Sequence, residues 1–343
     1  MRRSGLRWLK RNPTKIINVD RLLVLVTGDR IGDALLKWPI IAGLKRSRPG
    51  ISLTWIAARR ASVFCGPLAP LVDGVIDESI EKAGIGISWK EFLQPAPRYQ
   101  ADIVISTEPK IRNAILDRRI THRKFISPAA NFFFSDVKPD SPAQIDDSVQ
   151  RRLRRLFELA VGQTIEPVHH VPLSDKLISQ ATQLLPPGRT YVGFSPGAGG
   201  ERKRWPLERF IQAAETQEKR GRIAVFFLGP EETHLLAEIK SALPHALLPE
   251  YDELGPRGGG VLLSIALARQ LHCSVANDSG GGHILAAGGR PLISLYGHTS
   301  AAKFRPAYGK HYAISAAEFG SEHMEAIEVE TVTQAIDSML ALC

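Results

Sequence analysis

The sequence is poor in cysteine and has no long apolar run. Its three cysteines, Cys65, Cys273 and Cys343, stand far apart with no CxxC pair among them. This spacing argues against a disulfide framework or a cysteine-based zinc site, and it is typical of a reducing compartment. No stretch reaches the roughly 20 apolar residues that cross a bilayer. The apolar run 22–26 is too short for a secretory signal, so we expect a cytoplasmic protein.

Three familiar motifs are also missing. The loop 28–33 reads G-D-R-I-G-D rather than GxGxxG, which disfavours a dinucleotide site. The glycine loop that begins at Ser195 is not closed by GK[ST], so it is not a P-loop. The stretch 277–283, NDSGGGH, lacks the GxSxG elbow of α/β hydrolases because Asn277 stands at the first glycine.

The composition that remains is that of an ordinary globular protein with an uneven charge. Its 343 residues are 44% hydrophobic and 23% charged, and this length favours two domains. The net charge is +9, yet residues 1–175 hold 28 Lys and Arg against 18 Asp and Glu, while the remainder holds 16 against 17. The first half is therefore expected to face an anionic partner. No nucleic-acid-binding pattern is visible, so a phosphorylated substrate or a membrane is favoured over nucleic acid.

The first 20 residues form a basic tail. Six cations precede the first acid, Asp20, and Leu6, Trp8 and Leu9 are interleaved with them. Such a segment can lie on an anionic membrane surface, which would make the protein peripheral to the membrane. It is equally well explained as a solvated tail, and both interpretations stay open.

Beyond the tail, strands and helices alternate, which predicts an α/β protein with doubly wound parallel sheets. A segment with two prolines at 164–175 separates two such series. We therefore predict an N-terminal domain at 21–168 and a C-terminal domain at 169–343. The expected strands are 21–26, 51–57, 73–77 and 101–107, then 190–195, 222–229, 273–278 and 291–297.

Ligands bind beyond the carboxyl ends of strands in such sheets, so the polar loops there carry the candidate sites. Asp33 begins the first helix and is either a general base or an acid that favours the helix N-terminus. Glu231 and Glu232 follow the strand 222–229. An acid there can bind ribose hydroxyls, but a helix-start role is favoured.

The best anion site by residue type is the loop after Ser195. Gly197 and Gly199 let backbone N–H groups approach a diphosphate, and Lys203 and Arg204 supply positive charge.

The stretch 277–283 joins a strand end, a glycine turn and a helix start, which also suits a phosphate. Ser279 resembles a protease nucleophile only superficially, because no base and orienting acid accompany it in a known motif. The phosphate-cradle interpretation is preferred.

Together these loops resemble glycosyltransferase family 9, the bacterial heptosyltransferases of the lipopolysaccharide inner core. The resemblance rests on three motifs that occur in the family's order: LLVLVTGDRIGDALLKWPIIAGLKRSRPG (22–50), KRWP (203–206) and NDSGGGHILAAGGRPLISLYGHTS (277–300). Each motif is weak to moderate alone, and the three in order are specific. The resemblance covers most of the chain.

The resemblance implies the GT-B fold, in which two Rossmann-like domains face each other across a cleft. The N-terminal domain would bind the acceptor, a phosphorylated lipid-linked glycan, at the inner face of the inner membrane. The C-terminal domain would bind a nucleotide sugar, with ADP-heptose as the favoured donor. The reaction would invert the anomeric carbon, with no covalent enzyme intermediate and no metal cofactor.

The resemblance also implies residue roles. Asp33 would be the general base, Lys203 would stabilise the leaving diphosphate, with Arg204 as a helper, and Asp278 would orient the donor sugar or the glycine loop. The donor site would hold Gly197, Gly199, Arg204, Asp278, Ser279, Gly280, Gly281, His283 and Glu231. Lys110 and Arg112, in a basic segment, are candidates for contact with acceptor phosphate.

The chain departs from the family pattern at three places. Ser279 replaces the usual threonine, the loop has extra glycines at 281–282, and His298 stands where proline is common. These changes leave the donor sugar open. The rivals are a same-family transferase with another nucleotide sugar and a nucleotide-sugar-binding protein without catalysis; a GT-B epimerase or a serine hydrolase is disfavoured.

Overall fold

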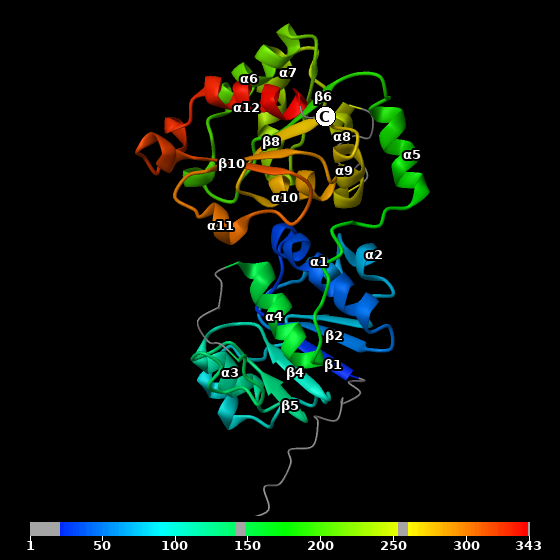
Figure 1. Cartoon of the computed structure of the whole chain (residues 1–343), viewed down its shortest axis with the longest axis vertical. Helices are drawn as coiled ribbons and strands as arrows, with labels where there is room; N and C mark the ends of the chain where they lie inside the picture. Colours follow the sequence, from blue (N-terminus) through cyan, green and yellow to red (C-terminus); the bar gives the residue numbers. More distant parts are fainter. Residues whose placement is uncertain (1–20, 141–147, 253–259, 342–343) are drawn as a thin grey trace, which may run out of the picture.

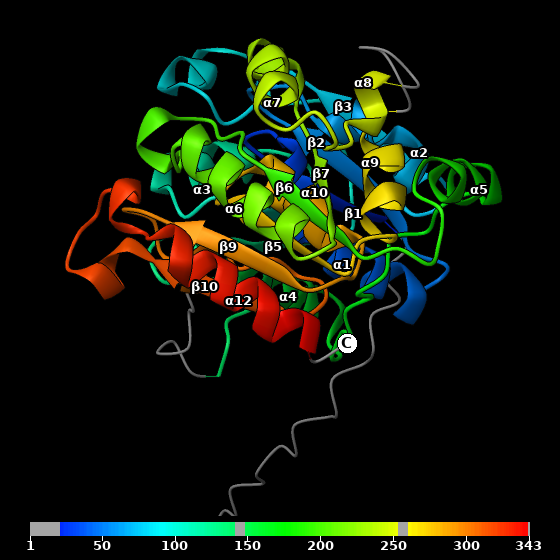
Figure 2. The same ribbon diagram turned by 90° about the horizontal axis from the view of Figure 1, so that it is seen from above.

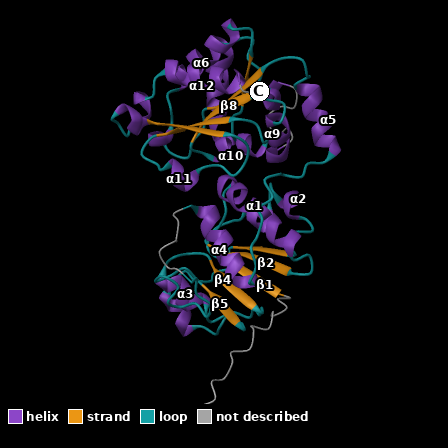
Figure 3. Ribbon diagram, viewed as in Figure 1, coloured by secondary structure: helices purple, strands orange, loops and turns teal. Residues whose placement is uncertain are grey.

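A computed structural model of the chain describes residues 21–140, 148–252 and 260–341. In these residues the strands form two separate parallel sheets of five strands each, and helices flank both sheets (Figures 1 and 3). The sheets belong to two domains stacked along the long axis of the molecule (Figure 1). The α/β class with two doubly wound sheets is therefore confirmed.

The first domain is built on the strand order β3-β2-β1-β4-β5. Its central strand β1 (Arg21–Val26) is buried along all but its first residue, as an unbroken apolar run predicts. Its neighbours are β2 (Ser52–Ala57) and β4 (Ile103–Ser106), and the edges are β3 (Glu78–Glu81) and β5 (Lys124–Ile126). The helices are α1 (Ile31–Ser47), α2 (Ala69–Val72), α3 (Ile111–Asp117) and α4 (Val149–Val161).

The second domain has the order β10-β9-β8-β6-β7. Its strands are β6 (Tyr191–Ser195), β7 (Ile223–Phe226), β8 (Cys273–Asn277), β9 (Leu292–Tyr296) and β10 (His311–Ser315). Its helices are α5 (Asp175–Leu184), α6 (Leu207–Lys219), α7 (Leu236–Ala242), α8 (Pro249–Asp252), α9 (Gly260–Ala268), α10 (Gly280–Ala287), α11 (Ala301–Phe304) and α12 (Val329–Ala341). Helix α5 lies beside α9 at one edge of this domain (Figures 1 and 2).

Helices α1 and α10 form the contact between the domains. Each follows a central strand, β1 or β8, and each begins at the carboxyl end of that strand. Figure 1 shows α1 at the junction, directly below α10. The two loops that the sequence singles out as sites are therefore brought to the same interface.

The chain crosses between the domains at residues 162–174. The N–H of Val168 donates to Pro39 O in the first domain at 2.9 Å, and Trp38 Nε1 donates to His170 O at 3.1 Å. His169 Nδ1 lies 2.6 Å from Ala307 O in the second domain. The predicted boundary at residue 168 falls in this crossing segment.

One predicted strand is wrong. Residues 73–77 form a turn, and strand β3 begins only at Glu78. Gly74 has a φ of +69°, and the N–H of Val75 donates to Val72 O, so this backbone turns instead of extending. The apolar residues of this turn suggested a strand. The actual strand, β3, is polar because it lies at the edge of the sheet. The basic tail 1–20 lies outside the described residues.

Candidate active site

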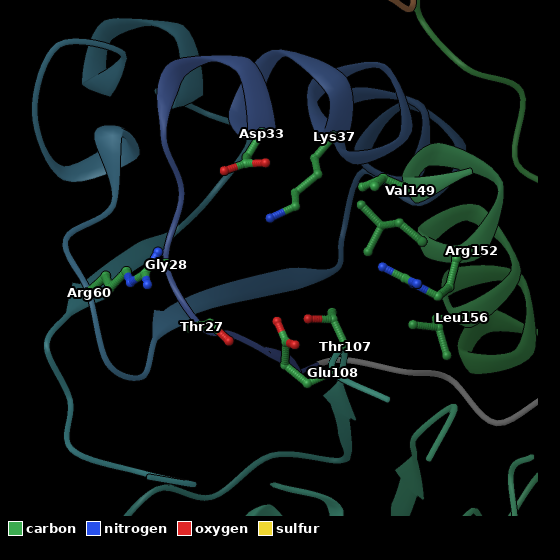
Figure 4. Close-up of a pocket in the computed structure, with 11 residues that line it drawn as sticks. Thr27, Gly28, Asp33, Lys37, Arg60, Thr107, Glu108, Val149, Arg152 and Leu156 are labelled. Carbon is green, nitrogen blue, oxygen red and sulfur yellow. The ribbon is translucent and has the colours of Figure 1, made fainter. Parts of the chain in front are cut away.

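The first half of the site is a cavity of about 240 Å³ in the N-terminal domain. Asp33 lines it from the first turn of α1, where its Oδ2 accepts the N–H of Arg30 at 3.3 Å. That bond fits the helix-start role foreseen for Asp33, yet the carboxylate also faces the cavity (Figure 4). The two interpretations of this residue are therefore compatible.

Lys37, one turn further along α1, is a residue that sequence reasoning missed. Its ammonium forms an ion pair with Asp29, whose side chain is fully buried. Asp29 also accepts from Trp55 Nε1 at 2.8 Å and from Ser62 Oγ at 3.0 Å. These bonds hold the carboxylate, and the carboxylate in turn fixes Lys37 at the cavity wall near Asp33 (Figure 4).

Two arginines add positive charge to the same cavity. Arg60 follows β2, and Arg152 reaches in from α4 (Figure 4). Thr107 and Glu108, at the end of β4, complete the polar part of the wall. The cavity can thus bind an anionic group beside Asp33.

The predicted acceptor cations Lys110 and Arg112 do not line this cavity. Lys110 is exposed at the start of α3, and Arg112 Nη2 lies 3.5 Å from Asn113 Oδ1. Two sequence signals could have identified the arginines of the cavity. Arg60 follows the end of a strand, and Arg152 lies on α4, the last helix of the domain.

The second half of the site lies in the C-terminal domain. Lys203 Nζ donates to Asp278 Oδ2 at 2.8 Å, and the Asp278 side chain is only 6% exposed. The same ammonium lies 5.5 Å from the ring of Phe304. The fold therefore brings these two loops together, although 75 residues separate the paired side chains in sequence.

Asn277 holds the two loops together, a role that sequence reasoning did not give it. This residue is fully buried. Its Oδ1 accepts the N–H of Trp205 at 3.1 Å, and its Nδ2 donates to Pro196 O at 2.7 Å. Arg204 Nε then donates to Ala198 O at 3.1 Å inside the glycine loop. The loop is thereby fixed in front of Lys203.

Gly197 is the glycine of this loop at which a side chain would collide. A Cβ on Gly197 would stand 2.6 Å from the carboxyl carbon of Glu232. Glu231, the predicted donor contact, is exposed, and it is its neighbour Glu232 whose carboxylate lies against the loop. Gly199 approaches the other domain, because a Cβ there would lie 3.7 Å from Arg30 Nη1.

Ser279 caps helix α10. Its Oγ accepts the N–H of Gly282 at 3.4 Å, and its backbone is extended as an N-cap requires. Gly281 faces Ser195, since a Cβ at Gly281 would fall 2.2 Å from Ser195 Oγ. Gly280 lies next to the first domain, since a Cβ there would stand 4.0 Å from Gly32 N. This geometry favours an anion at the helix N-terminus rather than a serine nucleophile.

His283 joins the two halves. Its ring is 6% exposed and lies against Gly32, where a Cβ would stand 2.8 Å from His283 Cδ2. Burial lowers the pKa of the imidazole to about 4, although the nearby carboxylates of Asp278 and Asp33 oppose the shift. The ring is therefore neutral at pH 7, and its Nδ1 has no hydrogen-bond partner. Asp33 and Asp278, from the two domains, therefore act on one and the same ring.

The comparisons with known proteins agree with this arrangement. The model of glycosyltransferase family 9 (heptosyltransferase) matches residues 91–332. The chain belongs to this family. It is a glycosyltransferase, as the sequence motifs indicated.

Two curated relatives of this family 9 enzyme cover most of its length. The lipooligosaccharide heptosyltransferase 2 of Haemophilus influenzae is 27% identical over 298 residues, which are 81% of this chain and 84% of that one. The lipopolysaccharide heptosyltransferase 1 of Pseudomonas aeruginosa is 25% identical over 306 residues, 84% and 81% of the two chains.

Solved structures support the fold. The family 9 glycosyltransferase of Veillonella parvula matches with a TM-score of 0.72 at 20% identity, covering 97% of this chain and all of that one. The ADP-heptose heptosyltransferase II of Escherichia coli matches with a TM-score of 0.65 at 19% identity, covering 94% and 99%. The predicted GT-B architecture, with two Rossmann-like domains facing each other, is confirmed.

In the part of the chain that the structure describes, no helix is long and apolar enough to span a membrane. No group of three or more His, Cys, Asp and Glu side chains within it is placed to hold a metal ion.

Proposed function

We propose that this enzyme transfers a heptosyl group from ADP-heptose to a hydroxyl of an anionic, lipopolysaccharide-type acceptor, with inversion at the anomeric carbon. The relatives named above are heptosyltransferases, which supports the sugar. One of the similar solved structures is an Escherichia coli heptosyltransferase with ADP, which supports the nucleotide.

The contact between Gly32 and His283 is the observation on which the proposal rests. It brings the turn that carries Asp33 against the helix that follows Asp278. An acceptor in the cavity beside Asp33 would thus meet a donor held at the N-terminus of α10. We assign acceptor binding to the N-terminal domain and donor binding to the C-terminal domain.

In the proposed reaction, the carboxylate of Asp33 takes the proton of the acceptor hydroxyl. The oxygen attacks the anomeric carbon from the side opposite the diphosphate, a new C–O bond forms, and the bond to the phosphate oxygen breaks. ADP leaves with the electron pair. No enzyme-bound intermediate is needed, since one displacement inverts the carbon.

The leaving diphosphate gains negative charge as the bond breaks, and groups aimed at it lower the barrier. Lys203 supplies a cation, and the N–H groups at the start of α10 supply a dipole. Lys203 is paired with Asp278 in the structure. We propose that the diphosphate takes over the ammonium, and that Asp278 then orients the sugar. No resident metal is required.

The acceptor's anionic group is assigned to the cations that line the cavity, Arg60, Arg152 and Lys37. A phosphate or carboxylate group on a sugar binds arginine well, because its oxygens can accept two parallel hydrogen bonds from the planar guanidinium group. This assignment replaces Lys110 and Arg112 as the first acceptor contacts. The uneven charge of the two domains supports it, because the excess of positive charge lies in the N-terminal half.

A thermal-shift panel of ADP, UDP, GDP and their sugar conjugates tests the donor. A ligand that binds only the folded state raises the melting temperature, so ADP and ADP-heptose are expected to give the largest shifts. A melting-temperature shift with a UDP or GDP sugar, and none with ADP, would show that the donor is not ADP-heptose. Binding of ADP-heptose without transfer to any acceptor would indicate the non-catalytic alternative.

A further inference from the structure

Exposed large apolar side chains gather on one part of the N-terminal domain. Of the large hydrophobic residues that are exposed in the described chain, most come from residues 89–133: Trp89 at 52%, Phe92 at 49%, Leu93 at 89%, Ile111 at 50% and Phe133 at 70%. Scattered single hydrophobics on a surface need no explanation, but a local concentration does. We call these five residues the apolar surface.

The turn that carries the first three is held rigidly. The carboxylate of Glu91 accepts the N–H groups of Gly86, Ile87 and Ser88 at 2.9, 2.7 and 2.8 Å. From the end of α3, Arg119 donates to Glu91 O and, at 2.6 Å, to Gln94 O. A turn fixed by this many bonds presents its apolar side chains to solvent as a stable feature.

The side chains on that turn also pack on one another. The rings of Trp89 and Phe92 are stacked with their centroids 5.9 Å apart, and the guanidinium of Arg119 lies 5.2 Å from the Phe92 ring. Leu93 projects beyond them as the most exposed of the set. The turn therefore presents its three apolar side chains to solvent in a fixed arrangement.

The loop that carries Phe133 is tied to the same end of α3. Arg118, the neighbour of Arg119, donates to Phe134 O at 2.6 Å and to Asp136 Oδ1 at 2.5 Å. Immediately before Phe133, residues 130–132 all have positive φ, between 47° and 61°, although none is glycine. Strain of this kind persists where surrounding structure enforces it and is frequent at functional sites. Here it accompanies a phenylalanine that points to solvent.

The charges around the apolar surface are mainly positive. Lys90, Lys110 and Lys138 are exposed, and Lys138 Nζ lies 6.0 Å from the ring of Phe133. Two of the nearby acids are engaged, because Glu91 is bonded to backbone N–H groups and Asp136 to Arg118. The surface thus combines aromatic rings with exposed lysines.

We propose that the apolar surface docks this enzyme on an anionic lipid bilayer. Aromatic side chains favour the level of the lipid headgroups, and lysines beside them are attracted by anionic lipids. Helix α3, which links the two loops, begins three residues after Glu108, a wall residue of the cavity. It lies at the end of the molecule away from the second domain (Figure 1). Docking there leaves the donor domain in water and sets the cavity close to the membrane.

This inference adds a location to the proposed function and rests on it only for the lipid-linked acceptor. The test measures lipid contact and not transfer, so the two can fail separately. It uses the five tryptophans of the chain, of which Trp38, Trp55 and Trp205 are buried at 2%, 0% and 1% exposure. In a full-length Trp8→Phe variant, Trp89 is the remaining tryptophan that lipid can reach.

The first experiment adds vesicles that contain brominated phosphatidylglycerol to the Trp8→Phe variant. Bromine quenches indole fluorescence at short range, so the Trp89 share of the emission is expected to be lost. A variant with both Trp8→Phe and Trp89→Phe is the control and should not be quenched. Equal emission of the Trp8→Phe variant with and without brominated lipid would overturn the proposal.

The second experiment separates the apolar surface from the basic tail. Cosedimentation of full-length Phe92→Ser/Leu93→Asp with phosphatidylglycerol vesicles is compared with wild type and with Tyr312→Ser, which alters an exposed ring (45%) on the other domain. Loss of two apolar anchors is expected to weaken binding about 10-fold or more, with the control unchanged. Equal binding of all three proteins would assign membrane contact to the tail and overturn the proposal, as would the absence of wild-type binding.

Discussion

The hydroxyl of Tyr308 donates to the carbonyl oxygen of Leu35 at 2.8 Å and thereby joins the two domains. Leu35 stands four residues before Pro39, which lies inside helix α1 and has no N–H to offer that carbonyl. Tyr308 fills the missing bond from the second domain. The residue is 2% exposed, and burial raises the pKa of its hydroxyl well above the usual range, so it stays a donor.

Replacement of Tyr308 by Phe is expected to destabilise the protein. The change leaves Leu35 O buried without a donor, which costs about 1–3 kcal/mol. The midpoint of urea unfolding should fall accordingly. Tyr312→Phe, at an exposed position, is the matched control and should change little. Equal midpoints for the two variants would contradict the role assigned to this bond.

The Gly32 contact makes a second prediction. In Gly32→Ala the new methyl group would lie 2.8 Å from His283 Cδ2, and the buried ring has little room to move. Overpacking of this kind costs about 1–3 kcal/mol, here at the domain contact. We expect a lower kcat and a higher KM for the donor in steady-state assays.

Gly50→Ala serves as the control, because a Cβ at Gly50 meets nothing within 4 Å. If Gly32→Ala behaves like Gly50→Ala, the two loops do not work as one site.

Lys203→Met is expected to slow transfer. If the ammonium stabilises the leaving diphosphate, its loss should lower kcat by about 10²–10³-fold, as for other groups that act on developing charge. It also leaves the buried Asp278 unpaired, so unfolding must be measured alongside the kinetics. Lys219→Met, which breaks only an exposed pair with Glu215, should keep full activity. A Lys203→Met enzyme with wild-type kcat would rule out this assignment.

The buried His283 predicts a pH dependence of stability. Its folded pKa is about 4 and its usual value is 6.5, so between these values the unfolded chain binds a proton that the folded chain does not. The sign is therefore fixed: stability falls as pH drops from about 6.5 to 4, by up to about 3 kcal/mol.

The measurement is the free energy of unfolding of wild type and His283→Gln at pH 7.5 and at pH 4.5. The variant is expected to lose less stability over this interval, since glutamine does not titrate. Parallel losses in the two proteins would show that His283 does not set the acid sensitivity.

The sequence was informative where one residue type or one run decides the structure. The apolar run of β1 predicted the buried strand that the structure shows. The glycines before Lys203 predicted a loop there, and its binding of an anion stays a prediction. Both loops follow strand ends of a parallel sheet, and the resemblance to family 9 placed Asp278 and Lys203 in one donor site.

Contacts that depend on long-range packing could not be predicted from the sequence. The support of Lys37 by Asp29 needs β2 beside β1, and the bond from Tyr308 to Leu35 needs the second domain. Glu232 rather than Glu231 faces Gly197 because the direction of each side chain depends on a 3₁₀ turn that composition does not reveal. Lys110 and Arg112 were predicted from charge alone, whereas the residues that line the cavity, Arg60 and Arg152 among them, are fixed by the packing of β2 and α4.

The most direct test of the central claim is the rate of sugar transfer by Asp33→Asn, with purified ADP-heptose and acceptor. The variant keeps the size of the side chain and an oxygen that can still accept the N–H of Arg30. It is expected to bind ADP as wild type does and to lose about 10²–10⁴-fold in kcat, the usual contribution of a general base. Asp73→Asn, at an exposed carboxylate, should be fully active. Transfer by Asp33→Asn at the wild-type rate would contradict the account.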